Sequence, residues 1–405
     1  MKKNFFRVSA KYFVPMILGI VAVGCSSDDN NGGSNNEDEY LLRGELSDRR
    51  ELKSGETYIL SGGFTVKNGG LLKINKGVTI ISEDDGDVDY ILVEQGGMID
   101  AQGTANEPIV MTSDLKEPGA WGGIHICGRA PINLEGGSGK SEIGDATYGG
   151  SDINDNSGTL RYIRLEYTGF AFSEEKESNG FTFYGVGSGT TCEYLQAYMG
   201  ADDGFEWFGG SVDAKYFVST GSGDDSFDWT EGWNGRGQFW VAQQVAAEGD
   251  CLIEADNNGS NNMSTPISYP TIANLTMIGN NLSASSRGIR LRAGTHVKMY
   301  NALVTGKDRA VTTETEGTEN SFLNGTSVVE HTYVSTSFVH SNSEVNLVGK
   351  TGNAEGQTIT FDGIVSTIDG GKDMSAVDSY FTKAEYKGAI SSSNNWTLGW
   401  TKGVN

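Results

Sequence analysis

Short apolar runs separated by small polar residues recur along most of the chain. Within a run, hydrophobic and polar positions alternate, and Gly, Asn, Asp and Ser fill the gaps between runs. This alternation is typical of β-strands with one buried face, and little of the chain shows a helical period. Examples are the runs LRYIRLEYTG (160–169), EYLQAYMG (193–200), AKYFVSTG (214–221) and NLTMIGN (274–280). The pattern predicts an all-β protein built as a sandwich, a barrel or a β-solenoid.

A repeat in the middle of the chain favours the solenoid. The segment YLQAYMGADDGFEWFGG (194–210) matches YFVSTGSGDDSFDWTEG (216–232) at a constant offset of 22 residues. A further 22 residues place QFWVA (238–242) beneath YFVST (216–220). One such unit cannot bury its own hydrophobic face, so neighbouring units must stack. The period fits one coil of a parallel β-helix, in which each coil adds ~4.8 Å to the stack.

Strand alternation predicts which side chains of the stacked coils face the core. We expect these residues to point inward: Leu195, Ala197, Phe217, Ser219, Phe239 and Val241. We expect these to point outward: Tyr194, Gln196, Tyr216, Val218, Gln238 and Trp240. The same alternation makes an internal aromatic column of Phe205, Trp207, Phe227 and Trp229.

Composition and charge narrow the classes of function. The 405 residues include 57 Gly and 6 Pro without a Gly-X-Y period, which indicates many turns and excludes collagen. The net charge of −23 comes from 53 acidic and 30 basic residues. A chain this acidic repels phosphate backbones, so we expect no binding to nucleic acid.

The first 40 residues are expected to direct the protein to a membrane. Residues 1–24 combine a basic start with an apolar run, as secretory signal peptides do. Small residues before Cys25 resemble the lipobox of bacterial lipoproteins, which implies cleavage before Cys25 and lipidation of that residue. The alternative is an ordinary signal peptide with a chance cysteine. Residues 25–40 are polar and predict a flexible tether, so the β-helix would span 41–405, with a C-terminal cap around 380–405.

A ladder of acidic residues is the strongest candidate for chemistry. It consists of Asp202, Asp203, Glu206, Asp224, Asp225 and Asp228, with Asp250 and Glu254 near the next coil. Carboxylates stacked ~5 Å apart repel one another unless a cation neutralises them, and Ca²⁺ accepts carboxylate oxygens in flexible geometry. We therefore name calcium as the candidate cofactor. The alternative is that the Asp-Asp pairs are turn residues that cap local backbone N–H groups, which we favour for at least one Asp of each pair.

Two further pairs of residues are candidates for ligand binding. Trp233 and Trp240 are flanked by Gly, Asn, Arg and Gln, a setting in which an exposed indole could stack on a sugar ring. Arg290 and Arg292 are the only outward pair of arginines on one expected strand.

Several segments resemble one family of Bacteroidota lipoproteins. They include GLLKINKGVTI (70–80), WGGIHICGRAPIN (121–133), DDGFEWFGG (202–210) and the closing YKGAI (386–390) and NNWTLGWTKG (394–403). The resemblance covers nearly all of residues 41–405 and implies a right-handed parallel β-helix of the pectin-lyase-like class, without a firmly assigned activity. In pectate-lyase-like enzymes, calcium held by surface acids bridges a uronic-acid substrate, and an arginine acts as the base.

These observations favour a lipid-anchored protein of the outer membrane, exposed at the cell surface, that binds polysaccharide or another surface ligand without cleaving it. One alternative is a calcium-dependent polysaccharide lyase or another carbohydrate-active enzyme, such as a glycoside hydrolase that uses two carboxylates. Another is a structural or adhesive envelope protein. The sequence predicts a membrane partner through the anchor and names no protein partner.

Overall fold

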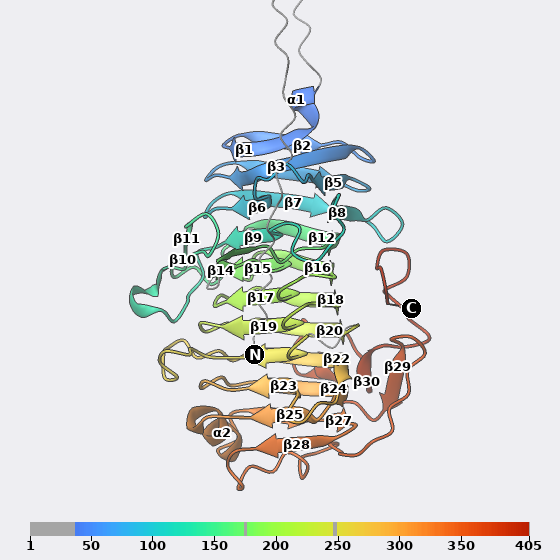
Figure 1. Ribbon diagram of the computed structural model, residues 1–405. Coiled ribbons are helices and arrows are strands. Elements are labelled where there is room, and N and C mark those ends of the chain that lie inside the picture. The colour runs from blue at the N-terminus through green and yellow to red at the C-terminus, as the bar shows by residue number, and fades with distance from the viewer. Residues whose placement is uncertain (1–36, 174–175, 246–248, 405) are drawn as a thin grey trace, which may run out of the picture. The chain divides into compact units, whose positions relative to one another are not determined.

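The short apolar runs form parallel strands that pair coil upon coil in a right-handed parallel β-helix (Figure 1). This computed structural model describes residues 37–173, 176–245 and 249–404. Every coil-to-coil pairing of the large sheet is parallel, because each coil returns to the start of the next along the same direction. The predicted all-β solenoid is confirmed.

The coils have three faces, each a stack of parallel strands. Long strands run across the first two faces: β12 (Gly158–Glu166), β16 (Thr191–Tyr198), β18 (Ala214–Thr220), β20 (Arg236–Gln243), β22 (Thr271–Asn281) and β24 (Lys298–Lys307). Shorter strands extend the first face: β2 (Arg49–Leu52), β4 (Leu71–Asn75), β7 (Met98–Gln102) and β26 (Val328–Glu330). Others extend the second face: β5 (Thr79–Ser82), β8 (Ile109–Ser113) and β27 (Tyr333–Val334).

The third face positions the candidate site. Its strands are β6 (Tyr90–Val93), β9 (Ile124–Cys127), β15 (Phe181–Tyr184), β17 (Phe205–Phe208), β19 (Phe227–Thr230), β21 (Ile253–Ala255), β23 (Arg287–Leu291), β25 (Arg309–Thr313) and β28 (Ser337–His340). At the N-terminal end, β1 (Leu41–Leu46) and β3 (Thr57–Val66) turn from the second face to the third.

The remaining elements lie outside the coils. They are α1 (Glu37–Tyr40), α2 (Glu316–Leu323), the 3₁₀ turns Glu135–Gly137 and Met374–Ala376, and three antiparallel pairs: β10 (Gly139–Lys140) with β11 (Thr147–Tyr148), β13 (Ala171–Ser173) with β14 (Lys176–Glu177), and β29 (Ser366–Asp369) with β30 (Tyr386–Ile390). Within the described part of the chain, no helix is long and apolar enough to cross a lipid bilayer.

Aromatic rings fill the middle of the core. Phe205 and Phe227 stack with ring centroids 5.3 Å apart, and Trp207 and Trp229 are fully buried beside them. The predicted internal aromatic column is therefore confirmed.

The turn from the first face to the second is a single residue in the left-handed conformation. It recurs in all six long strands, at Tyr162, Tyr194, Tyr216, Phe239, Asn274 and Asn301. The aromatic members project outward and stack on one another: the Tyr162–Tyr194, Tyr194–Tyr216 and Tyr216–Phe239 centroid distances are 4.2, 4.3 and 5.0 Å. We call these four rings the outer aromatic stack.

The third coil of the repeat departs from the predicted register. Phe217 pairs with Trp240, an offset of 23 residues, because the chain needs one more residue to reach β20 than to reach β18. A shift of one residue exchanges the inside and outside of a strand. Trp240 therefore enters the core, Phe239 joins the outer aromatic stack, and Val241 packs in the same outer cluster as Phe239. The predicted facing was wrong for these three residues.

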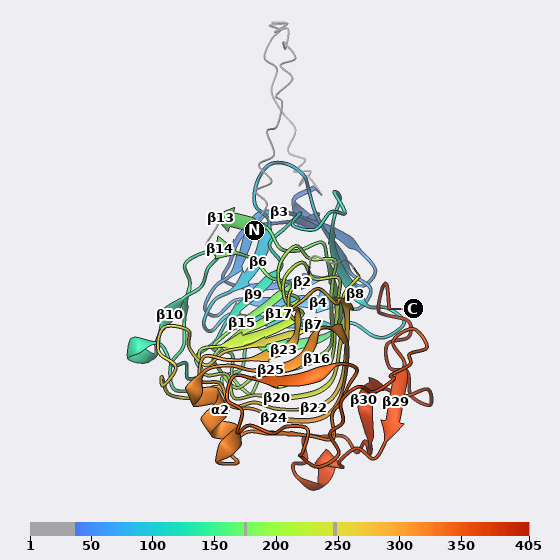
Figure 2. The ribbon, with the colours of Figure 1, turned by 60° about the horizontal axis from the view of Figure 1, so that its bottom comes forward.

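The sequence predicts that residues 380–405 cap the last coil. In the structure, the C-terminal segment does not cover that coil. It runs back along the outside of the β-helix, where Figures 1 and 2 show β29 and β30 beside the coils. Trp396 and Trp400 lie edge-on against Tyr194, and the backbone N–H of Lys402 donates to Gln196 Oε1 at 2.8 Å. The segment thus covers the outer aromatic stack, which would otherwise expose a column of rings to water.

Candidate functional site

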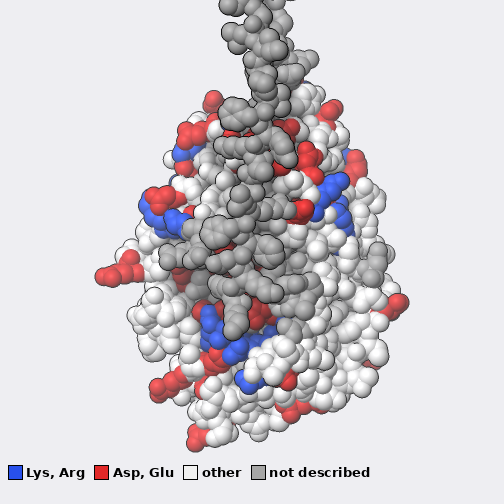
Figure 3. All heavy atoms as spheres, viewed as in Figure 1, with Lys and Arg blue, Asp and Glu red and all other residues white. Residues whose placement is uncertain are grey.

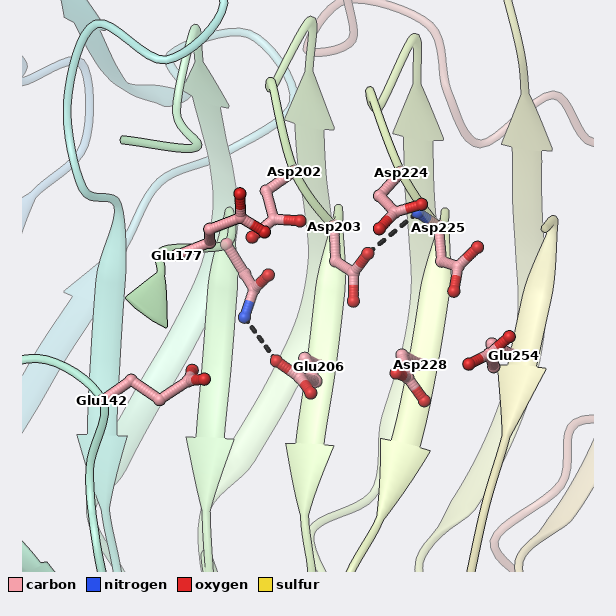
Figure 4. Close-up of a pocket in the computed structure, with 10 residues that line it drawn as sticks. Glu142, Glu177, Asp202, Asp203, Glu206, Asp224, Asp225, Asp228 and Glu254 are labelled. Atoms are coloured by element: carbon pink, nitrogen blue, oxygen red, sulfur yellow. Dashed lines mark hydrogen bonds between the residues drawn. The ribbon is translucent and has the colours of Figure 1, made fainter. Parts of the chain in front are cut away.

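Carboxylates line a cavity of about 220 Å³ at the start of the third-face strands (Figure 4). We call it the acidic cavity. Its lining residues are Glu142, Glu177, Asn179, Asp202, Asp203, Glu206, Asp224, Asp225, Asp228 and Glu254. Every charged residue of this lining is acidic, so the cavity concentrates negative charge.

Strand register brings the acids together. Glu206 pairs with Asp228, and Asp228 pairs with Glu254, on three consecutive coils. Parallel strands lie ~4.8 Å apart, so the carboxylates of one row stand about that far from their neighbours. The predicted ladder is present, and Glu254 continues it.

The second Asp of each Asp-Asp pair accepts a hydrogen bond from the backbone of the next coil. An oxygen of Asp203 accepts the backbone N–H of Asp225 at 2.8 Å, and an oxygen of Asp225 accepts the backbone N–H of Cys251 at 2.5 Å. Both carboxylates cap backbone N–H groups, but these belong to the next coil and not to the local turn that the sequence suggested. Their carboxyl groups therefore have a structural role and still contribute charge to the cavity.

Burial makes the ionised form of these acids costly. Burial and the nearby carboxylates of Glu177 and Asp224 raise the pKa of Asp202 to about 8. Burial and neighbouring acids also raise the pKa of Glu206 and of Asp228 well above the usual carboxyl range. A bound cation would reverse this balance because it stabilises the ionised form.

The geometry suits a hard divalent cation. Oxygens of Asp203, Glu206 and Asp228 lie within 4.8 Å of one another. A second such group consists of Asp202, Asp203 and Asp224. Asp228 Oδ1 is buried and has no hydrogen-bond partner among the described residues. Calcium accepts six to eight such oxygens at about 2.3–2.6 Å, so either group could supply part of its shell.

Residues outside the repeat complete the cavity. Glu142 comes from the insertion that contains β10 and β11, and Glu177 comes from β14. Tyr184 donates its hydroxyl to Glu142 at 3.0 Å, and Asn179 donates its amide to Glu206 at 2.5 Å. Sequence reasoning missed these acids and Asn179 because no repeat aligns them with the ladder.

Arg290 and Arg292 form ion pairs with Glu254, which lies at one end of the acidic cavity. Arg290 pairs with Glu254 at 2.9 Å and with Glu314 at 3.1 Å, and Arg292 pairs with Glu254 and with Asp256. Arg290 lies on β23, and Arg292 follows directly after that strand, so only Arg290 is on the expected strand. Burial lowers the pKa of Arg290, but hydrogen bonds to Glu314 and Glu254 outweigh it and hold that pKa above its ordinary value.

Trp233 and Trp240 are not on the surface. Both are fully buried, and their rings stack in the core with a centroid distance of 6.1 Å. Each indole N–H donates to a backbone carbonyl, of Val212 and of Ala214. The prediction that these tryptophans bind a ligand was wrong. The one-residue shift turns Trp240 inward, and the ring of Trp233 stacks on that of Trp207 in the core with a centroid distance of 4.7 Å.

Cys25, the predicted lipidation site, lies outside the described residues, as do the predicted signal peptide and most of the predicted tether.

Residues 44–401 match the family model described as a pectate-lyase-like β-helix domain. No match was found among curated proteins or among solved structures. Because the matched region covers most of the chain and the parallel β-helix is present in the structure, the protein belongs to the family of pectate-lyase-like β-helix domains.

Proposed function

We propose that this protein is a lipid-anchored, surface-exposed lipoprotein that binds an acidic polysaccharide through calcium held in the acidic cavity. The family is compatible with carbohydrate-related roles. The single observation that carries the calcium proposal is the convergence of nine carboxylates on one cavity, with a buried oxygen of Asp228 left without a partner among the described residues. Such a cavity repels an anionic ligand when empty and attracts one through a metal ion.

The proposal favours binding over cleavage. A lyase needs a base near the metal, and a useful base has a pKa near the working pH. Arg290 and Arg292 are the guanidinium groups paired with Glu254 at the end of the cavity. Burial lowers the pKa of both, but their bonds to the neighbouring carboxylates outweigh it and hold both above the ordinary value. Each guanidinium group therefore stays protonated near neutral pH and is not available to accept a proton from a substrate.

A glycoside hydrolase is the second candidate. Retaining hydrolysis needs one ionised and one protonated carboxyl group about 5 Å apart. Oxygens of Glu206 and Asp228 lie within 4.8 Å, and burial raises the pKa of both acids. This proximity favours the hydrolase over the lyase as the catalytic alternative.

Affinity electrophoresis against soluble polysaccharides, with calcium or with chelator, tests the proposal. We expect retardation by an acidic polysaccharide in calcium and none in chelator. Release of reducing ends would favour the hydrolase, and new absorbance from unsaturated products would favour the lyase. A protein that binds calcium but no polysaccharide would support a structural or adhesive role.

Anchoring is tested separately. We expect radiolabelled palmitate to enter the wild-type protein and not Cys25→Ala, and external protease to digest the protein on intact cells. Labelling of the variant would contradict the proposed anchor.

A further inference from the structure

A second pocket lies further along the third face, and its charge is opposite. It has a volume of about 350 Å³ and is lined by Arg287, Arg309, Thr312, Thr313, Glu314, Val339, His340 and Ser341. We call it the basic pocket. Figure 3 shows basic side chains gathered on this face at the level of β23 and β25.

The two arginines of the basic pocket are not equally neutralised. Arg287 pairs with Glu314 at 2.8 Å, and the same carboxylate also receives Arg290. Arg309 donates to the Ser285 hydroxyl at 3.1 Å, and no carboxylate in residues 37–173, 176–245 or 249–404 forms an ion pair with it. The pocket therefore carries an excess of positive charge.

Thr312 gives an independent indication of a ligand. Its side chain is 2% exposed, and its hydroxyl has no hydrogen-bond partner among the described residues. Thr312 pairs with Arg290 across the strands, so it belongs to the outward row that also contains Glu254 and Asp228. A buried hydroxyl without a partner is unfavourable, and an anionic oxygen would supply the acceptor that it lacks.

One wall of the pocket is held in place by hydrogen bonds. Thr313 donates its hydroxyl to Glu319 at 3.1 Å, so the contact of 2.9 Å between Thr313 and His340 Nδ1 has the histidine as donor. The imidazole is thereby fixed at the edge of the pocket, which leaves Arg309 and Thr312 as the groups open to a ligand.

We infer that the basic pocket binds an oxyanion, the carboxylate or sulfate group of an acidic polysaccharide, with Arg309 and Thr312 as its donors. Guanidinium groups bind such planar or tetrahedral anions with two parallel hydrogen bonds. Glu254 and Thr312 are two strand steps apart, about 10 Å along the stack. A glycan chain lying along the axis could therefore bind calcium with one anionic group and the basic pocket with another.

The identity of the polymer as an acidic polysaccharide rests on the proposed function. The test of the basic pocket uses small anions and does not depend on that function. Sulfate and galacturonate are titrated separately into the purified full-length protein by calorimetry, at constant ionic strength set with chloride and in the presence of chelator. We expect saturable binding of at least one of the two anions without calcium, which also shows whether sulfate or carboxylate is preferred.

Two variants and a control decide whether the basic pocket is the site. Arg309→Gln and Thr312→Val should each weaken binding about tenfold, as expected for loss of a hydrogen bond to a charged group. Arg49→Gln, which changes an exposed arginine on β2, should have no effect. Thr312→Val removes a hydroxyl without a partner, so a purely structural role predicts a folded protein with unchanged binding.

Absence of saturable binding, or equal binding by the wild type and both variants, would overturn the inference. Binding of small anions together with failure to bind any acidic polysaccharide would leave the basic pocket established and the proposed function refuted.

Discussion

At the scale of single residues, repulsion between the carboxylates of the acidic cavity should make the stability of the folded protein depend on pH. A carboxyl group whose pKa is raised on folding destabilises the folded protein once it is ionised. Asp202 has an unfolded pKa near 4 and a folded pKa of about 8. Without a divalent cation, we therefore expect the melting temperature to fall as the pH rises from about 4 to about 8. With calcium, the fall should be much smaller, as scanning calorimetry would show.

Replacing one acid of the ladder should also relieve this repulsion and raise the melting temperature of the calcium-free protein. Asp228→Asn removes a carboxyl group whose ionisation is disfavoured by folding and keeps the side-chain shape, so the calcium-free protein should melt about 2 °C higher at pH 8. The exposed Asp84→Asn is the matched control and should leave the melting temperature unchanged. A lower melting temperature for Asp228→Asn would show that this carboxylate is stabilising without a cation.

Trp240 tests the corrected register. Trp240→Ala would leave a large cavity among stacked rings, and we expect unfolding in denaturant to show a loss of about 3–5 kcal/mol. A surface tryptophan would cost far less. Because the residue lies in the core, Trp240→Phe should recover most of the stability, and polysaccharide binding by this variant should match that of the wild type.

At the scale of elements, the C-terminal segment should separate from the coils as a unit. Trp400 is fully buried, and its carbonyl accepts a hydrogen bond from Arg164 at 2.6 Å. In Trp400→Ala, we expect amide hydrogens of residues 391–404 to exchange faster while those of β17 and β19 keep their protection. Equal loss of protection in both regions would mean that the segment and the coils unfold together.

Some features of the coils could be predicted from the sequence and others could not. The offset of 22 residues predicted the coils, the internal aromatic column and the acidic ladder, because equal spacing forces like residues into register. It could not predict the extra residue before Trp240, because nothing in the residues themselves marks where the coil lengthens. The alternation also could not predict the left-handed conformation of Tyr194, because a tyrosine, unlike a glycine, does not indicate a positive φ.

Contacts between distant segments were beyond sequence reasoning. Glu142 reaches the acidic cavity from an insertion, and the C-terminal segment packs against coils more than 200 residues earlier, as the Lys402–Gln196 contact shows. No repeat or alternation links such positions.

At the scale of the whole molecule, the third face combines two regions of opposite charge. The acidic cavity lies over β17, β19 and β21, and the basic pocket lies over β23, β25 and β28. Arg290 lies between them and pairs with Glu254 on one side and Glu314 on the other, whereas Arg292 pairs with Glu254 and Asp256. This arrangement suits an extended anionic polymer that uses a metal ion at one end and guanidinium groups at the other.

Calcium titration by isothermal calorimetry tests the central claim most directly. The purified protein, freed of divalent cations and held near pH 7.5, should bind calcium saturably with a dissociation constant below about 1 mM. Asp228→Asn should weaken that binding at least about tenfold, and Asp84→Asn should not change it. Absence of saturable binding by the wild type, or equal binding by Asp228→Asn, would contradict the assignment of the acidic cavity as a calcium site.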